Sequence, residues 1–280
     1  MSVDDYLNDL LAKKSNNYGY NQKENSAYDC MYKLINDWGR SYNNFSNSNY
    51  ISIKMQKSGS KAKGDAIKGK SDIDIFVSIE DSNNLYTVKD YYDDLYKYLK
   101  EHLRNNEVRR QNVSIGITYA GCSIDITPGK KVKYSAYDLL FNNKSDTDHY
   151  IYSTKKSNNT LTNIQKHIDM VRTSGLTKEI MILKIWRNCH GLELPSIAIE
   201  IITCEVLKND RTYSLYGNVK KVLESLRNTI DYRRIIDPAN SNNNIAETMT
   251  DAEKAMIKRV AIQSLSYDHG DTVAIDKIVW

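Results

Sequence analysis

Two aspartates one residue apart, followed at once by an apolar run, most limit how this chain folds. In the segment Asp72–Val77, Asp72 and Asp74 alternate with isoleucines before Phe76 and Val77. Side chains in a strand alternate between its two faces. The pattern therefore predicts a strand that buries its isoleucines in a core and presents both carboxylates on the opposite face.

A Gly-Ser pair, Gly59 and Ser60, precedes the two aspartates. Neighbouring carboxylates repel one another unless a cation lies between them, and Mg²⁺ or Mn²⁺ prefers such oxygen ligands. A glycine-containing turn offers backbone N–H groups and a hydroxyl to a phosphate. The combination predicts phosphoryl or nucleotidyl transfer, and the competing interpretation is a strand end with two solvated acids.

A third acid lies downstream in Ser123–Thr127, where two isoleucines share one face and Asp125 takes the other. Pro128-Gly129 is expected to end this strand. An unpaired acid on a core strand is costly to bury. Asp125 is therefore predicted to be the third ligand of the metal site, and the alternative is a strand-edge acid that faces water.

The two halves of the chain differ in their periodicity. The first half predicts helices at 24–39 and 87–104, with strands at 50–57 and within 112–127. After a polar crossover at 142–160, the second half predicts helices throughout: 161–173, 177–190, 196–208, 217–229 and 250–267. The expected fold is α+β and bilobal, with a mixed-sheet core lobe at 1–150 that carries a long N-terminal helix. A helical lobe is expected at 151–280.

Two positions in the helical half attract attention. Lys184 lies within an almost wholly apolar helix, so it either snorkels to the surface or directs its charge at a phosphate. Ser196 follows Pro195 at a helix start, where it either caps the helix or meets an anion. At the end of the chain, Trp280 is expected to pack onto one of the lobes.

The chain of 280 residues carries a net charge of +4, which permits an anionic ligand without requiring nucleic acid. Five lysines at 57–70 form either a solvated loop or a surface that attracts a triphosphate. The four cysteines show no pairing or zinc-binding pattern and predict reduced core thiols in a cytoplasmic protein. No apolar run is long enough to predict a membrane span.

The ordered set of motifs resembles one branch of the DNA-polymerase-β-like nucleotidyltransferases. The branch holds 2′-5′ oligoadenylate synthetase, archaeal CCA-adding enzyme, cyclic GMP–AMP synthase and the bacterial CD-NTases. The motifs are Gly-Ser, Asp-x-Asp, the single later Asp, Lys-x-Trp at Lys184–Trp186, Pro-Ser before an isoleucine-rich helix, and Asp237-Pro238 through Asn244. The resemblance spans about residues 25–267 and implies a bilobal polymerase-β-like fold.

The resemblance also implies roles for individual residues. Asp72, Asp74 and Asp125 would hold two Mg²⁺ (or Mn²⁺) ions, with Asp125 nearest the attacking hydroxyl. The remaining nucleotide-binding positions would grip the donor triphosphate: Gly59, Ser60, Lys184 and Ser196. Members of the branch often have a base-stacking Tyr after this serine, whereas this chain has Ile197, and Asp65 stands where many have Thr.

A compact bacterial CD-NTase fits the chain best, because no segment corresponds to a tRNA-binding body or a zinc ribbon. Such an enzyme would join NTPs, including ATP, into a cyclic di- or trinucleotide second messenger. The message would be sensed by a downstream effector, typically in antiphage defence. A basic surface formed by lysines at 61–70, 130–133 and 155–156 could bind an activating RNA.

Two other functions compete with this prediction. The first is a template-independent enzyme that makes linear oligonucleotides or tails RNA in the manner of CCA or poly(A) addition. The second is a catalytically silent nucleotide or RNA sensor, which the presence of all three acids disfavours. The sequence leaves open the bases, the linkage (2′-5′ or 3′-5′), the product size and the trigger.

Overall fold

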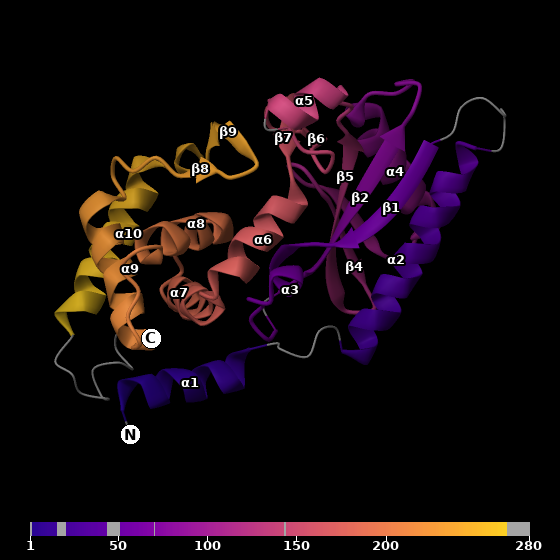
Figure 1. Cartoon of the computed structure of the whole chain (residues 1–280). Helices are drawn as coiled ribbons and strands as arrows, with labels where there is room; N and C mark the ends of the chain where they lie inside the picture. The colour runs from indigo at the N-terminus through magenta and orange to yellow at the C-terminus, as the bar shows by residue number, and fades with distance from the viewer. Residues whose placement is uncertain (1, 16–20, 44–50, 70, 143, 268–280) are drawn as a thin grey trace. The chain divides into compact units, whose positions relative to one another are not determined.

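The computed structural model describes residues 2–15, 21–43, 51–69, 71–142 and 144–267. The expected contacts of Trp280, and the position of Lys70, lie outside these residues. The chain forms two compact units, each with its own core (Figure 1). The sheet unit comprises Tyr18–Ala62 and Ser71–Ile168, and the helical unit comprises Met1–Asn17, Lys63–Lys70 and Asp169–Trp280.

A mixed seven-stranded sheet forms the centre of the sheet unit. Its main path runs β1-β2-β5-β4-β3, and β6 pairs with both β5 and β7. Only the β2–β5 pair is parallel among these ladders. The strands are β1 (Ile51–Lys57), β2 (Ile73–Asp81), β3 (Glu107–Arg110), β4 (Ile115–Tyr119), β5 (Cys122–Lys131), β6 (His149–Ser153) and β7 (Asn158–Thr162).

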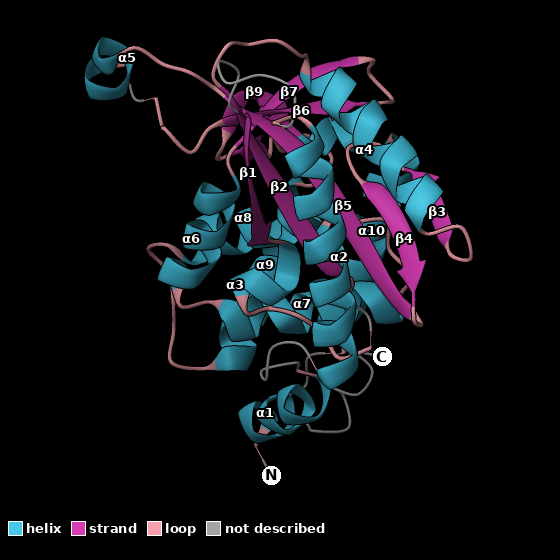
Figure 2. Cartoon of the chain, turned by 90° about the vertical axis from the view of Figure 1, so that its right-hand side faces the viewer, coloured by secondary structure: helices cyan, strands magenta, loops and turns pink. Residues whose placement is uncertain are grey.

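Helices α2 (Gln22–Ser41) and α4 (Val88–His102) cover one face of this sheet (Figure 2). The alternation in β2 decides which face they cover, because its four aliphatic residues at odd positions are almost fully buried. These four residues of β2 are Ile73, Ile75, Val77 and Ile79. They share a core with Met31, Ile35 and Trp38 of α2 and with Tyr91, Leu95 and Leu99 of α4. The opposite face of β2 is left to Asp74, Phe76, Ser78 and Glu80.

The strand after Asp125 continues further than its sequence suggested. Pro128-Gly129 does not end β5, which runs on to Lys131 and pairs with β6. Glycine is required at 129 by a close approach, since a Cβ there would fall 2.3 Å from Cζ of Phe76. The segment 142–160, expected to be only a polar crossover, contains β6 and the start of β7, and the short helix α5 (Ala136–Phe141) precedes it.

The helical unit has the expected helices with small shifts at their ends. Buried aliphatic residues of α7, α8 and α9 dominate its core, to which α1 adds Leu7, Leu10 and Leu11. Helix α6 (Ile164–Ser174) connects the sheet unit to it. The unit contains α1 (Val3–Lys14), α7 (Thr177–Cys189), α8 (Ser196–Leu207), α9 (Leu215–Thr229), η1 (Ile245–Thr248) and α10 (Asp251–Ser266).

The segment that resembles the Asp-Pro…Asn-Asn motif folds as a small hairpin of β8 (Ile236–Asp237) and β9 (Asn240–Asn244). Asp237 Oδ1 accepts from the N–H of Ala239 at 2.8 Å, and Oδ2 accepts from Asn243 Nδ2 at 3.0 Å. Asn244 Oδ1 accepts from the N–H of Ile235 at 2.9 Å. These side chains hydrogen-bond the turn itself, so the motif has a structural role.

The observed division differs from the expected one at residue 150. Strands β6 and β7 belong to the sheet, so the sheet unit extends to Ile168, and α1 packs with the helical core. Cys189 is exposed and not part of a core, whereas Cys122 is buried as expected. Across the described residues, no helix combines the length and apolar character needed to cross a bilayer.

We predict that Gly129→Ala destabilises the protein by about 1–3 kcal/mol, because the new methyl group overlaps the ring of Phe76 in a packed region. Urea denaturation measures the change. Ser123→Thr is the matched control, since it adds a methyl group at an exposed position of the same strand. Equal stability of Gly129→Ala and the wild type would show that Phe76 moves aside without cost.

Candidate active site

The Gly-Ser pair lies against the second aspartate of the Asp-x-Asp motif. After β1 ends, the N–H of Ser58 donates to the carbonyl of Asp74 at 3.0 Å, and the chain enters the short helix α3 (Gly59–Lys63). Gly59 has a φ of +63°, and a Cβ there would fall 1.9 Å from Asp74 Oδ2. Only glycine satisfies both the backbone conformation and the contact with the carboxylate.

Parallel pairing places the second and third acids directly side by side. Asp74 on β2 is the partner of Asp125 on β5, and Asp72 directly precedes β2. Asp72 is exposed, whereas Asp74 and Asp125 are half-buried. Gly59 and the paired acids Asp74 and Asp125 therefore lie together, as the motif spacing indicated, with Ser60 and Asp72 next to them in the chain.

The three carboxylates have an electrostatic cost. Burial raises the pKa of Asp125, and the negative charge of Asp72 raises it further. A hydrogen bond from Gln111 and the charge of Arg109 act in the opposite direction but do not cancel the shift. Sequence reasoning missed Gln111 and Arg109, because their positions relative to Asp125 depend on the pairing of β3, β4 and β5.

The described residues include no group of three or more His, Cys, Asp or Glu side chains already arranged as a metal site. The three acids nevertheless suit a hard divalent cation, since they offer only oxygen ligands. The repulsion between Asp72 and Asp125 is what a bound cation would relieve. The donor set therefore fits a divalent metal, without deciding which metal or how many ions.

Lys184 occupies the centre of a buried charge cluster in the helical unit. Its Nζ lies 2.7 Å from Asp65 Oδ2 and 2.8 Å from Glu200 Oε1, while Lys63 Nζ lies 2.7 Å from Glu200 Oε2. The lysine is 3% exposed, so it does not snorkel to the surface. In this structure its charge is balanced by carboxylates, and a contact with a phosphate stays a prediction.

The four residues of this cluster, Lys63, Asp65, Lys184 and Glu200, tie the segment Lys63–Lys70 to α7 and α8. Burial raises the pKa of Asp65. Burial also acts to raise the pKa of Glu200, but Lys184 and Lys63 outweigh it and the pKa is lowered. The sequence marked Asp65 only as an unusual residue and did not identify Glu200.

Ser196 is the first residue of α8, and the N-cap before it is Pro195, which makes no side-chain capping hydrogen bond. Its hydroxyl instead accepts from Arg187 Nη1 at 2.9 Å, and the same nitrogen donates to the carbonyl of Leu194 at 3.0 Å. Ile197 packs against the helical core. Arg187, which the sequence analysis missed, is the cation that accompanies Ser196.

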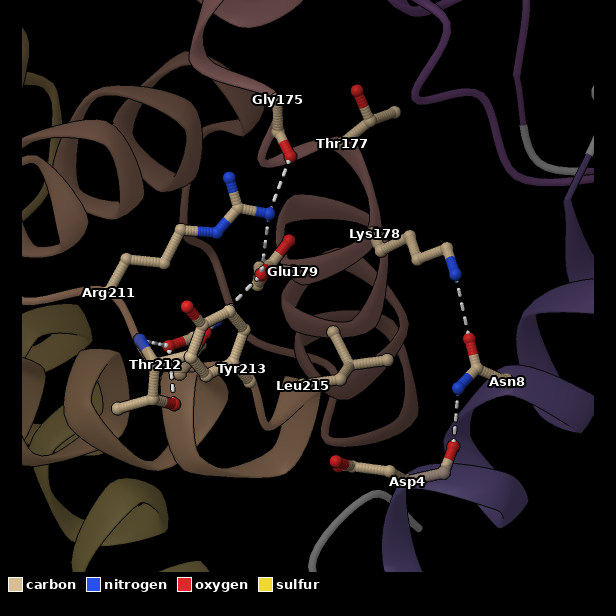
Figure 3. A pocket seen from close by; sticks show the side chains of 11 residues that line it. Asp4, Asn8, Gly175, Thr177, Lys178, Glu179, Arg211, Thr212, Tyr213 and Leu215 are labelled. Atoms are coloured by element: carbon tan, nitrogen blue, oxygen red, sulfur yellow. Dashed lines mark hydrogen bonds and ion pairs between the residues drawn. The ribbon is translucent and has the colours of Figure 1, made fainter.

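A cavity of about 780 Å³ in the helical unit is lined by none of the predicted site residues (Figure 3). Its polar groups largely satisfy one another: Lys178 donates to Asn8, and Arg211 donates to the carbonyl of Gly175. A second cavity, of about 370 Å³, lies in the sheet unit and is lined by Phe76 and Ser78. These follow Asp74 on the same face of β2, so this cavity extends along the sheet face that carries the acids.

We predict that Asp125→Asn stabilises the metal-free protein at about pH 7. The raised pKa means that ionised Asp125 costs stability above its folded-state pKa, and that the cost vanishes below its unfolded-state pKa. The gain in melting temperature should therefore disappear near about pH 4. Asp146→Asn, at an exposed position of the same unit, is the control, and a gain that persists unchanged at low pH would contradict the prediction.

We predict that Glu200→Gln lowers the free energy of unfolding by about 3–5 kcal/mol, because it leaves the buried Lys184 and the partly buried Lys63 with one carboxylate. The matched control is Asp210→Asn, which breaks the exposed pair with Lys221 and should cost about 0–1 kcal/mol. Urea denaturation gives both values. Similar losses in the two variants would mean that the buried cluster contributes no more than a surface pair.

Comparison with known proteins agrees with the geometry of the site. Residues 42–116 match the family model of the nucleotidyltransferase domain, a range that contains the Gly-Ser and Asp-x-Asp motifs. The cyclic AMP-AMP-AMP synthase of Escherichia coli is 24% identical over 255 aligned residues, which cover 79% of this chain and 75% of the relative.

Solved structures extend the likeness to nearly the whole chain. E. coli CdnC with ATP has a TM-score of 0.73 at 18% identity, covering 99% of this chain and 96% of that one. The CdnC:HORMA-deltaN complex gives 0.72 at 19% identity, with coverage of 98% and 95%. Bradyrhizobium diazoefficiens CdnG with GTP gives 0.68 at 12% identity, with coverage of 99% and 96%. The chain therefore contains a nucleotidyltransferase domain and has the fold of the CD-NTases, and the resemblance read from its motifs is confirmed.

Proposed function

We propose that this protein is a metal-dependent nucleotidyltransferase that joins NTPs into a cyclic di- or trinucleotide. The observation that carries the proposal is the direct pairing of Asp74 with Asp125, with Gly59 packed on the Asp74 carboxylate. This constellation lies in a chain whose overall fold is shared with cyclic oligonucleotide synthases. A silent sensor would have no need of three such acids, two of which, Asp72 and Asp125, repel one another.

Each predicted site residue of the sheet unit has a role in the proposed reaction. Asp72, Asp74 and Asp125 would hold divalent cations, Mg²⁺ or Mn²⁺, which neutralise charge on the reacting phosphate. Gly59 lets the backbone approach the donor triphosphate, and the Ser60 hydroxyl binds it. Asp125 orients the attacking hydroxyl. The hydroxyl gives up its proton to solvent, its oxygen bonds to the α-phosphorus of the donor, and the bond to pyrophosphate breaks.

Substrate and partner follow from the relatives. The E. coli relative is a cyclic AMP-AMP-AMP synthase, and E. coli CdnC is described with ATP and with a HORMA partner. We propose ATP as the main substrate and a HORMA-like protein as a partner. The roles of Lys184 and Ser196 in binding the triphosphate remain predictions. Ile197 lacks the stacking ring of a Tyr, so we also predict that the donor pocket selects less strongly for adenine.

The lysines expected to bind RNA already have partners in several cases. Lys61 pairs with Glu24 at 2.6 Å, Lys63 with Glu200, and Lys130 with Asp81 at 3.1 Å. Such pairing reduces the charge available to neutralise a nucleic acid backbone. This observation disfavours the RNA-tailing alternative and an activating RNA on this surface, although lysines 155 and 156 remain exposed.

Incubation with radiolabelled ATP and Mg²⁺ or Mn²⁺, followed by phosphatase, tests the proposed activity. A cyclic product has no terminal phosphate and should resist the phosphatase, because the intermediate's own hydroxyl attacks its own activated phosphate in one site. The double variant Asp72→Asn, Asp74→Asn should form no product while keeping a wild-type circular dichroism spectrum. A ladder of phosphatase-sensitive oligomers would support the linear alternative, and product from the double variant would reject the assigned acids.

A further inference from the structure

The turn between β3 and β4 holds one residue, Gln111, in a fixed position beside the sheet. Its backbone N–H donates to the carbonyl of Ser114 at 2.9 Å. Its own carbonyl accepts from Tyr92 Oη at 3.1 Å and from Thr154 Oγ1 at 3.0 Å. Partners from α4, from the turn itself and from the end of β6 thus fix the Gln111 backbone.

The side chain of Gln111 reaches the third acid of the site. Its Nε2 donates to Asp125 Oδ1 at 3.0 Å, while its Oε1 accepts from Ser114 Oγ at 2.6 Å. The opposite orientation of the amide would place two oxygens 3.0 Å apart, which ionised Asp125 does not tolerate. The carboxylate, which only accepts, therefore sets the orientation of the amide, and the Ser114 hydroxyl donates to the amide oxygen at the other end.

Gly116 provides the space for this contact. It lies directly opposite Asp125 in the β4–β5 ladder. A Cβ on Gly116 would fall 2.4 Å from Gln111 Nε2 and 3.1 Å from Arg109 Nε. The φ of Gly116 is not in the left-handed region, so an alanine would fit the backbone and fail only for lack of room. The absence of a side chain at 116 and the hydrogen bond from Gln111 are two parts of one arrangement.

We infer that Gln111 is a positioning residue for the nucleotidyl transfer: its amide holds Oδ1 of Asp125 and so fixes the carboxylate whose Oδ2 would serve the divalent cation. The inference deepens the proposed function and depends on it for its mechanism. A ligand carboxylate that is itself hydrogen-bonded loses fewer rotamers when a metal binds. Removing such a hydrogen-bond partner commonly lowers metal affinity or activity about 10–100-fold. The competing explanation is that Gln111 only stabilises the β3–β4 turn.

The main test replaces Gln111 with methionine, an unbranched side chain of similar length without a donor. The rate of pyrophosphate release from ATP and the affinity for Mn²⁺ should both fall roughly 10–100-fold. The KM for ATP should change by less than about threefold, because the triphosphate contacts remain. Mn²⁺ affinity is measured by electron paramagnetic resonance with a non-hydrolysable ATP analogue. Gln263→Met, on an exposed position of α10, is the matched control and should match the wild type.

A second variant tests the space at position 116. Gly116→Ala should displace the Gln111 amide and reproduce the loss of rate and Mn²⁺ affinity, while the metal-free melting temperature stays near that of the wild type. The double variant Gly116→Ala, Gln111→Met should lose no more rate or Mn²⁺ affinity than Gln111→Met alone, because both substitutions remove the same hydrogen bond. Additive losses would mean that the two residues act separately and would overturn the arrangement.

Unchanged rate and Mn²⁺ affinity in Gln111→Met would overturn the inference. So would a lower melting temperature with both readouts intact, because that result describes a purely structural residue. If Gln111→Met does not fold, Gly116→Ala and Ser114→Ala decide by the same two readouts. A wild type that makes no product counts against the proposed function alone, and its Mn²⁺ affinity relative to Gln111→Met still decides the inference. A wild type that binds no Mn²⁺ would overturn both.

Discussion

The parallel pairing of β2 with β5 is the constraint on which the rest of the site depends. The two strands are far apart in sequence, and their register sets Asp74 beside Asp125. A shift of one residue in either strand would turn its acid into the isoleucine core and bring its isoleucines to the polar face. The burial of Ile73, Ile75 and Ile124 under α2 and α4 therefore fixes the register, and the register fixes the acids.

A second set of charges is handled differently. In the helical unit Lys63, Asp65, Lys184 and Glu200 balance one another in a buried cluster, whereas in the sheet unit the negative charge of Asp72 raises the pKa of Asp125. Balanced buried pairs add little net stability but are costly to break singly. The repulsion between Asp72 and Asp125 is a local cost of the kind found where a ligand, not the protein, completes the arrangement.

Much of this could be predicted from sequence, and the limits have physical causes. The alternation in Asp72–Val77 and the helical periods of the second half depend on local patterns, and the strands, helices and acid positions they predicted agree with the structure. Contacts that arise from strand pairing and tertiary packing could not be predicted from the sequence. Gln111 reaches Asp125 only because two hairpin registers coincide, and Lys184 proved to be ion-paired because Asp65 and Glu200 converge on it from distant segments. Pro128-Gly129 was predicted to end the strand, because the close approach of Phe76 to Gly129 is a tertiary contact that local sequence does not reveal.

The paired acids are each matched by a glycine that gives a polar group access to the carboxylate. Gly59 brings backbone against Asp74, and Gly116 admits the Gln111 amide to Asp125. A side chain at either position would occupy the volume next to the oxygen atoms. The sheet therefore supports two adjacent carboxylates by leaving side chains out around them: the backbone of Gly59 packs against Asp74, and the Gln111 amide donates to Asp125. This explains why the Gly-Ser pair and the acids form one unit physically, although they are separated in the sequence: the glycine is part of the carboxylate's environment, not only part of a phosphate-binding turn.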